Sequence, residues 1–275
     1  MNTAPGEFPT PLLEAQSSTY TFEGDNMVDI ASYQYTMNSW YLKKLLQFET
    51  ALPGVGIELL PEDHERAKRL FVTAHWLDYK LDDTANIAAS FKEYAAILHT
   101  VEDDTSISNE IKSSSSPGLL SAVTLLNNAV RHRSKEYVQN LAKTGIGIGA
   151  IAVAKAQESS SKRYINMVEE EGRLTGQLVS LGILGEAALT TSDTTNDKLI
   201  KCIEDLTTFM TLVDAAYDLP ADNKAGLTQV KPSRWNQALL YGRAIKIAAK
   251  GTNTFTTKLL LDIYNQPKPL EARVS

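Results

Sequence analysis

Apolar residues recur every three or four positions along most of this chain, which is the spacing of one face of an α-helix. The stretch that ends at Ala51 shows this clearly, and the Pro53-Gly54 pair then stops the pattern. No segment alternates between apolar and polar residues as a half-buried strand would, and no repeat period is visible. The pattern predicts an all-helical (all-α) bundle, with helices over residues 28–51, 61–86, 90–101, 119–143, 150–157, 161–189, 197–219, 233–249 and 254–264.

The domain organisation follows from where this periodicity begins. The N-terminal stretch lacks it and contains several prolines, so we expect an irregular tail over residues 1–27 and a single helical domain over residues 28–275. A chain of 275 residues that is 43% hydrophobic can bury one substantial core. Within the domain, the serine-rich residues 103–118 predict an exposed loop. The glycines at 145, 147 and 149 either interrupt a helix or allow another helix to pack closely.

Two aspartates stand in an apolar part of the helix predicted over residues 61–86. Asp78 and Asp82 are four residues apart, so both carboxylates leave one face of the helix, one turn apart. The flanking Trp76, Leu77 and Leu81 leave this face little polar surface. Two carboxylates in an apolar wall repel each other and lose hydration, and a cation between them offsets both effects. Magnesium suits paired carboxylates and leaves room for a phosphate.

The same arrangement recurs near the end of the helix predicted over residues 197–219. Asp214 and Asp218 follow a nearly continuous apolar run and are again four residues apart. Asp222 comes four residues later, beyond Pro220, which we expect to end the helix. We expect the two aspartate pairs to face each other across a cavity, and this pairing is the strongest functional signal in the chain.

Charge and cysteine content narrow the classes of partner and compartment. The net charge of −6 disfavours a nucleic-acid partner, which needs a basic surface. The single cysteine, Cys202, cannot form an internal disulfide, which suits a reducing compartment. No apolar run reaches the ~18 residues of a transmembrane helix, and no secretory signal is visible at the N-terminus. We therefore expect a cytoplasmic protein without a transmembrane segment.

Other chemistries fit the sequence less well. A di-iron site in a helical bundle requires Glu-x-x-His motifs, and none of the four histidines has Glu three residues before it. The glycines at 145, 147 and 149 do not follow a strand, and their spacing matches neither nucleotide-binding fingerprint. Glycine inside a helix costs about 1 kcal/mol relative to alanine. Gly176 and Gly182 therefore indicate close approach by a neighbouring helix or by a ligand.

Three segments of the chain resemble motifs of the class I isoprenoid synthases and occur in the same order as in that superfamily. This all-helical superfamily contains polyprenyl synthases, squalene and phytoene synthases and terpene cyclases. Residues 77–83 are similar to the first aspartate-rich motif in its Asp-x-x-x-Asp form. Residues 174–178 (Leu-Thr-Gly-Gln-Leu) are similar to the helix that closes on the diphosphate. Residues 209–222 are similar to the second motif, and Lys224 stands near the position of a Gly-Lys pair. The resemblance covers about residues 28–250 and implies a helical bundle with a central apolar cavity.

The resemblance also implies roles for individual residues. It implies that Mg²⁺ is held by Asp78, Asp82, Asp83, Asp214, Asp218 and Asp222, of which Asp78, Asp82, Asp214 and Asp218 are the catalytic set. It implies a prenyl diphosphate substrate, contacted by Arg173, Thr175, Gln177, Lys224 and Lys155. The basic residues that could replace these are Arg131, Arg133, Lys162 and Arg163. The resemblance is compatible with peripheral membrane contact and with a homodimer.

The chain departs from chain-elongating members of the superfamily at three places. Ala215 replaces a further aspartate of the second motif, and Leu174 stands where a lysine is expected. No Arg-Arg-Gly follows the first motif, where residues 84–88 are Thr-Ala-Asn-Ile-Ala. Those basic groups serve a second diphosphate, so repeated addition of isopentenyl diphosphate is not expected.

Three functions remain open from the sequence. The first is a Mg²⁺-dependent prenyltransferase or prenyl-coupling enzyme that ionises one allylic diphosphate and transfers the prenyl cation to an unknown acceptor. The second is a terpene cyclase of the same fold. The third, from a different class, is a non-catalytic protein that binds an isoprenoid or acts as a partner subunit.

Overall fold

The computed structural model describes residues 48–81, 87–102, 126–190 and 194–265. Every regular element in these ranges is helical, which confirms the all-α prediction. The elements are η2 (Leu52–Val55), α2 (Pro61–Leu81), α3 (Ile87–Glu102), α6 (Lys135–Gln157), α7 (Ser161–Leu184), η4 (Gly185–Leu189), α8 (Thr194–Ala225), α9 (Arg234–Gly251) and α10 (Thr254–Asn265). The predicted tail over residues 1–27, the helix over residues 28–47 and the loop over residues 103–118 lie outside the described residues.

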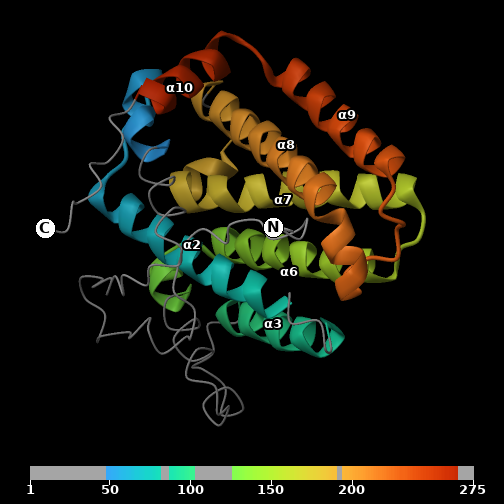
Figure 1. Ribbon diagram of the computed structural model, residues 1–275. Coiled ribbons are helices and arrows are strands. Elements are labelled where there is room, and N and C mark those ends of the chain that lie inside the picture. The colour runs from blue at the N-terminus through green and yellow to red at the C-terminus, as the bar shows by residue number, and fades with distance from the viewer. Residues whose placement is uncertain (1–47, 82–86, 103–125, 191–193, 266–275) are drawn as a thin grey trace, which may run out of the picture.

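Helix α7 occupies the middle of the bundle (Figure 1). It packs most extensively on α8, and it also contacts α6 and α2. Helix α3 packs on α6, and α9 packs on α8 at the outer edge of the molecule (Figure 1). Consecutive long helices therefore lie side by side from α6 to α9. Within the described ranges no helix is long and apolar enough to span a bilayer.

The seam between α7 and α8 depends on two glycines of α7. A Cβ atom at Gly172 would lie 2.5 Å from the Cα atom of Thr208, and one at Gly176 would lie 2.6 Å from the Cα atom of Glu204. The Thr207 hydroxyl of α8 also donates a 2.8 Å hydrogen bond to the Gly172 carbonyl. Helix α8 is thus the close neighbour predicted from Gly176.

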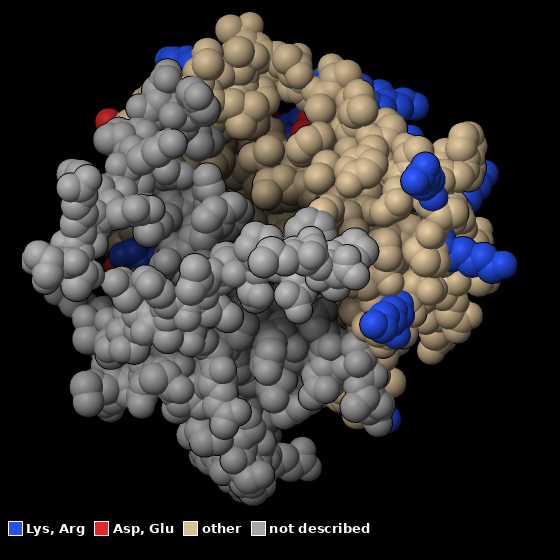
Figure 2. Space-filling model, viewed as in Figure 1, with Lys and Arg blue, Asp and Glu red and all other residues tan. Residues whose placement is uncertain are grey.

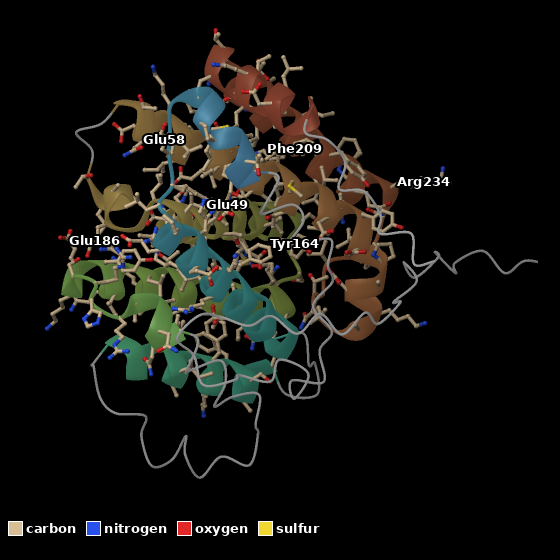
Figure 3. All side chains as sticks on the ribbon, turned by 90° about the vertical axis from the view of Figure 1, so that its left-hand side faces the viewer. Glu49, Glu58, Tyr164, Glu186, Phe209 and Arg234 are labelled. Atoms are coloured by element: carbon tan, nitrogen blue, oxygen red, sulfur yellow. The ribbon has the colours of Figure 1, made fainter. Side chains whose placement is uncertain are left out.

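The prediction of one continuous helix over residues 119–143 is wrong, because the chain turns at residues 131–134, between a helical segment at 126–130 and the start of α6 at Lys135. His132 adopts a positive φ of 65°, and Ser134 caps α6 by accepting a hydrogen bond from the Tyr137 amide. The Ser134 amide donates to the Glu186 carboxylate of η4 (2.6 Å), which lies at the edge of the bundle (Figure 3). A polar Arg-His-Arg-Ser run thus breaks a helix that apolar periodicity alone would continue.

Helix α6 runs without interruption through its three glycines. A Cβ atom at Gly145 would lie 2.7 Å from Leu98, and one at Gly149 would lie 2.9 Å from Phe91, both on α3. The Tyr94 hydroxyl donates to the Gly145 carbonyl (2.8 Å). Of the two predicted explanations for this glycine run, close helix packing is the confirmed one.

Helix α7 ends at Leu184, five residues before the predicted end of the helix at 189. Gly185 has a φ of 58°, a conformation that favours glycine, and the Arg66 guanidinium lies against it. Arg66 is only 2% exposed and donates hydrogen bonds to the Gly182 carbonyl (3.0 Å) and the Ile183 carbonyl (2.9 Å). These are two of the last four carbonyls of α7, which have no partner within the helix.

Replacing Arg66 by Met is expected to destabilise the fold by about 2–5 kcal/mol, because two buried carbonyls and the Asp63 carboxylate lose their donor. Arg66→Lys should recover only part of this loss, since one ammonium group cannot reproduce the fork of the guanidinium. Urea denaturation measures the free energy of unfolding of each variant. If Arg66→Met unfolded with the same free energy as the native protein, the capping role would be contradicted.

Candidate functional site

Helix α8 continues through Pro220 to Ala225, so the prediction that Pro220 ends the helix is wrong. Proline has no amide hydrogen, and within a helix this leaves the carbonyl four residues earlier without a donor. That carbonyl belongs to Ala216, and it accepts a 3.0 Å hydrogen bond from Nε2 of Gln237 on α9. A side chain from the neighbouring helix therefore replaces the missing backbone donor.

We expect Gln237→Leu to destabilise the protein by about 1–3 kcal/mol, because the Ala216 carbonyl is left without its donor. Pro220→Ala restores a backbone donor to the same carbonyl. In the Gln237→Leu background, Pro220→Ala should therefore recover most of the lost stability, as a double-mutant cycle can show. If the two substitutions instead changed the free energy of unfolding additively, Gln237 would not be acting as the substitute for the backbone donor that is missing at Pro220.

Because α8 continues, Asp214, Asp218 and Asp222 lie on one face of a single helix, one turn apart. Asp214 is exposed, whereas Asp218 and Asp222 are half-buried. Partial burial raises the pKa of Asp214, and the positive charge of Lys155 opposes that rise. Burial also raises the pKa of Asp218, and the negative charge of Asp214 raises it further. The carboxylates of Asp214 and Asp218 are thus less well solvated than that of a free aspartate, and the charge of Asp214 disfavours ionisation of Asp218.

Two neighbouring helices add polar groups to this stripe. Lys155 of α6 forms a 2.5 Å ion pair with Glu171 of α7 in a largely buried setting. Buried Tyr164 of α7 has a raised pKa, first because of burial and then because of the charges of Asp222, Glu171 and Asp218. Its ring points toward the middle of the bundle (Figure 3). We call this group of residues the α8 acidic cluster: Lys155, Tyr164, Glu171, Asp214, Asp218 and Asp222.

Neither Tyr164 nor Glu171 was among the predicted site residues. Glu171 lies four residues before Thr175, and Tyr164 lies seven residues before Glu171, so all three share one face of α7. Thr175 is half-buried on this face, one turn beyond Glu171. The sequence therefore contained this shared spacing. It indicates that these residues belong to the site only when α7 and α8 are known to be neighbours.

The predicted residues Arg173 and Gln177 lie elsewhere. Arg173 forms a bidentate ion pair with Glu170, and Gln177 donates to the Glu204 carboxylate (3.1 Å). Arg173 lines an open groove of about 330 Å³ between α7, α8 and α9. The other residues of this groove are mostly charged: Asn166, Glu169, Glu170, Lys201, Glu204, Asp205, Thr208, Arg243 and Ile247. Of the predicted aspartates whose side chains the structure describes, Asp214, Asp218 and Asp222, none lines this groove, and its lining does not match the predicted central apolar cavity.

Lys224, the last of the predicted diphosphate contacts, is exposed on the final turn of α8. It follows Asp222 by two residues, so it lies near the end of the aspartate stripe but not on the same face of the helix. Among the predicted basic contacts, Lys155 is thus the one that the structure brings into the α8 acidic cluster.

The first aspartate motif is described only in part. Asp78 lies on α2, as predicted, whereas Asp82 and Asp83 lie outside the described residues. Helices α2 and α8 run in the same general direction in two perpendicular views, so their C-terminal ends lie at the same end of the bundle (Figures 1 and 3). Both aspartate motifs are carried near those ends.

In the part of the chain that the structure describes, no three acidic, histidine or cysteine side chains converge enough to hold a metal ion. Successive turns place the carboxylates of α8 about 6 Å apart along the helix axis. A metal site here would therefore need oxygen donors from a second element. Residues 78–83 are the candidates by sequence, and Asp82 and Asp83 are not described.

Comparison with known proteins found no match to this chain among family models, curated proteins or solved structures.

Proposed function

We propose that this protein is a Mg²⁺-dependent prenyltransferase or prenyl-coupling enzyme of the class I isoprenoid synthase type. The observation that carries the proposal is the stripe of three aspartates on α8, which lies at the same end of the bundle as the C-terminal end of α2, the helix that carries Asp78. Burial of Asp218 and its repulsion by Asp214 disfavour the ionised form of Asp218, which lowers folding stability. Three aspartates on one face of α8, two of them with raised pKa values, therefore support a binding role.

The donor set fits magnesium. Asp214, Asp218 and Asp222 offer oxygen donors only. Burial raises the pKa values of Asp214 and Asp218, and the charge of Asp214 adds to the rise at Asp218, so a divalent cation would favour the ionised form of both groups. With residues of the first motif, the set that would hold the metal is Asp78, Asp82, Asp83, Asp214, Asp218 and Asp222. Bound there, magnesium would neutralise the charge that builds on a departing diphosphate.

The other residues of the α8 acidic cluster position a cation beside this stripe. Glu171 holds the Lys155 ammonium by an ion pair, and this ammonium is close enough to Asp214 to affect its pKa. Lys155 can therefore donate a charge-assisted hydrogen bond to a diphosphate oxygen. The Thr175 hydroxyl, one turn from Glu171, is a second donor on the same face.

The apolar part of the substrate requires an apolar wall next to the carboxylates. Met210 and Tyr217 of α8 are exposed and lie one turn from Asp214 on either side. We infer that these side chains contact the prenyl chain, which keeps water away from the cation formed when the diphosphate departs. Transfer to an acceptor and cyclisation both start from this cation, so a terpene cyclase remains the alternative within the fold.

The second candidate function is that of a non-catalytic isoprenoid-binding protein or partner subunit. The ion pair between Arg173 and Glu170 favours this candidate. The guanidinium of Arg173 is paired with Glu170 in a groove that Asp214, Asp218 and Asp222 do not line. With Arg173 elsewhere, fewer cations are available to stabilise a departing diphosphate.

One assay separates these functions. The full chain is incubated with geranyl, farnesyl or geranylgeranyl diphosphate and Mg²⁺, pyrophosphate release is measured, and products are identified by mass spectrometry. Release with a hydrocarbon or alcohol product indicates a cyclase, whereas release that depends on an added acceptor indicates a transferase. Binding without release indicates the non-catalytic protein. Efficient incorporation of labelled isopentenyl diphosphate into longer chains would refute single transfer.

A further inference from the structure

Helix α9 leaves one side uncovered by the described part of the protein. Leu240 and Ala244 are buried against α8, and Arg243 pairs with Glu169 of α7 (2.6 Å). The opposite side of α9 faces away from the bundle at the edge of the molecule (Figure 1). This orientation allows the opposite side of α9 to contact a partner.

The uncovered side of α9 is apolar. Trp235 is 71% exposed and Ile245 is 66% exposed, and Leu239 is also exposed. Small exposed residues lie between and beyond these side chains, and exposed Lys246, seven residues after Leu239, lies on the same face. We call the uncharged residues of this side the α9 outer face: Trp235, Ala238, Leu239, Gly242, Ile245 and Ala249. An exposed face that is apolar apart from one lysine indicates an interaction site.

The charges around this face all have one sign. Helix α9 contains no Asp or Glu, and Arg234, Lys246 and Lys250 are exposed on it, with exposed Lys231 just before it. The right-hand side of Figure 2 shows Lys and Arg side chains separated by uncharged surface. Carboxylates are visible there only at the bottom of the hollow between α8 and α9 (Figure 2). A chain with a net charge of −6 thus concentrates positive charge at this helix.

We propose that the α9 outer face binds the surface of a membrane that contains anionic phospholipids. Apolar side chains enter the acyl boundary, while Arg234 and Lys250 at the edges of the face, and Lys246 within it, keep their charged ends at the level of the headgroups. Tryptophan suits this boundary because its ring is apolar and its N–H remains a hydrogen-bond donor. The helix lies on the membrane without crossing it.

Charge complementarity selects this partner over a second copy of the chain. A symmetric dimer through the α9 outer face would place Arg234, Lys246 and Lys250 near the same residues of the other copy. Like charges in that position repel, whereas anionic headgroups attract them. The Arg234 side chain extends outward at the edge of the molecule (Figure 3).

Vesicle flotation of the full chain, without substrate, tests the proposal independently of the proposed function. We expect at least five-fold more protein on vesicles of phosphatidylcholine with phosphatidylserine than on phosphatidylcholine alone.

Trp235→Ser with Ile245→Ser should lower binding at least five-fold, whereas Leu60→Ser, at a residue 58% exposed on another surface, should not. Lys246→Glu with Lys250→Glu should remove the preference for phosphatidylserine, whereas Lys92→Glu with Lys143→Glu on α3 and α6 should not.

Trp235→Phe provides a second measurement, because it keeps an aromatic side chain but removes the indole. Vesicles should shift the fluorescence of the native protein to the blue, and Trp235→Phe should bind vesicles with a smaller shift. Equal binding to both kinds of vesicle, no binding, or equal losses in the control variants would overturn the proposal. A change in sedimentation coefficient for Trp235→Ser with Ile245→Ser, without an effect on vesicles, would instead identify a contact between copies and also overturn it.

Discussion

Replacing Asp218 by Asn is expected to lower kcat/KM for a prenyl diphosphate at least 100-fold, a loss of about 2.7 kcal/mol of transition-state stabilisation. Asp218 is the middle carboxylate of the α8 stripe, one turn from both Asp214 and Asp222, and the charge of Asp214 already affects its pKa. Asn keeps the size of the side chain but removes the charge that a magnesium ion requires. Pyrophosphate release at several substrate concentrations measures the change.

Stability measurements separate this loss of function from misfolding. Magnesium with pyrophosphate should raise the melting temperature of the native protein, because a ligand that binds only the folded state stabilises it. Asp218→Asn should abolish that rise. The matched control is Asp197→Asn, which makes the same chemical change at the other end of α8 and should keep both activity and the rise. An unchanged rise in Asp218→Asn would contradict the metal-binding role.

The pKa of Asp218 predicts whether Asp218→Asn raises or lowers the stability of the metal-free protein. Burial and the charge of Asp214 raise its folded-state pKa above the ordinary value of 3.8. The folded state therefore holds this proton more tightly than the unfolded state, and ionisation opposes folding as the pH rises above 3.8. Without metal, Asp218→Asn should be at least as stable as the native protein at pH 7, and any gain should vanish below the ordinary pKa.

Adding one methyl group at Gly172 or Gly176 is expected to destabilise the protein by about 2–3 kcal/mol. In each case the new Cβ atom would lie within 2.6 Å of a Cα atom of α8, so the two helices would have to separate. A side chain could rotate away, but a backbone atom cannot. Urea denaturation of Gly172→Ala and Gly176→Ala measures this loss.

Gly242→Ala is the matched control, because it makes the same change within helix α9. No atom lies within 4 Å of the position that its Cβ would take. This variant should gain about 0.5–1 kcal/mol from the better helix propensity of alanine. A similar gain at Gly176 would show that α7 and α8 are not held at the separation described above.

Helix locations were predictable from the sequence because apolar spacing and capping residues act locally. Ser233 was correctly placed at the start of α9, where it caps the helix by accepting from the Asn236 amide. The errors arose where a distant residue changes a local rule. Pro220 would end an isolated helix, but Gln237 supplies the missing donor. Helix α7 ends at Leu184, where Gly185 adopts a positive φ, and Arg66, more than 100 positions earlier, supplies donors to the carbonyls of Gly182 and Ile183.

The candidate site was predictable for the acidic residues and less so for the basic ones. The spacing of Asp214 and Asp218 is a property of one helix, so it could be read directly from the sequence. Which cation lies near them depends on how three helices pack. Lys155 reaches the stripe because α6 lies beside α7, whereas Arg173 leaves α7 on the side of Glu170 and the groove. Sequence order alone could not distinguish these two cations.

The position of Arg66 also constrains the order in which the chain can fold. Its guanidinium hydrogen-bonds to carbonyls 116 and 117 residues further along the chain. At ribosomal rates of about 5–20 residues per second, roughly 6–23 s pass before those carbonyls are synthesised. Burial of an unpaired guanidinium costs several kcal/mol, so during this interval Arg66 remains in water. The core around Arg66 therefore cannot be completed until Ile183 has been synthesised, and we expect a fragment that ends before Gly182 not to fold independently.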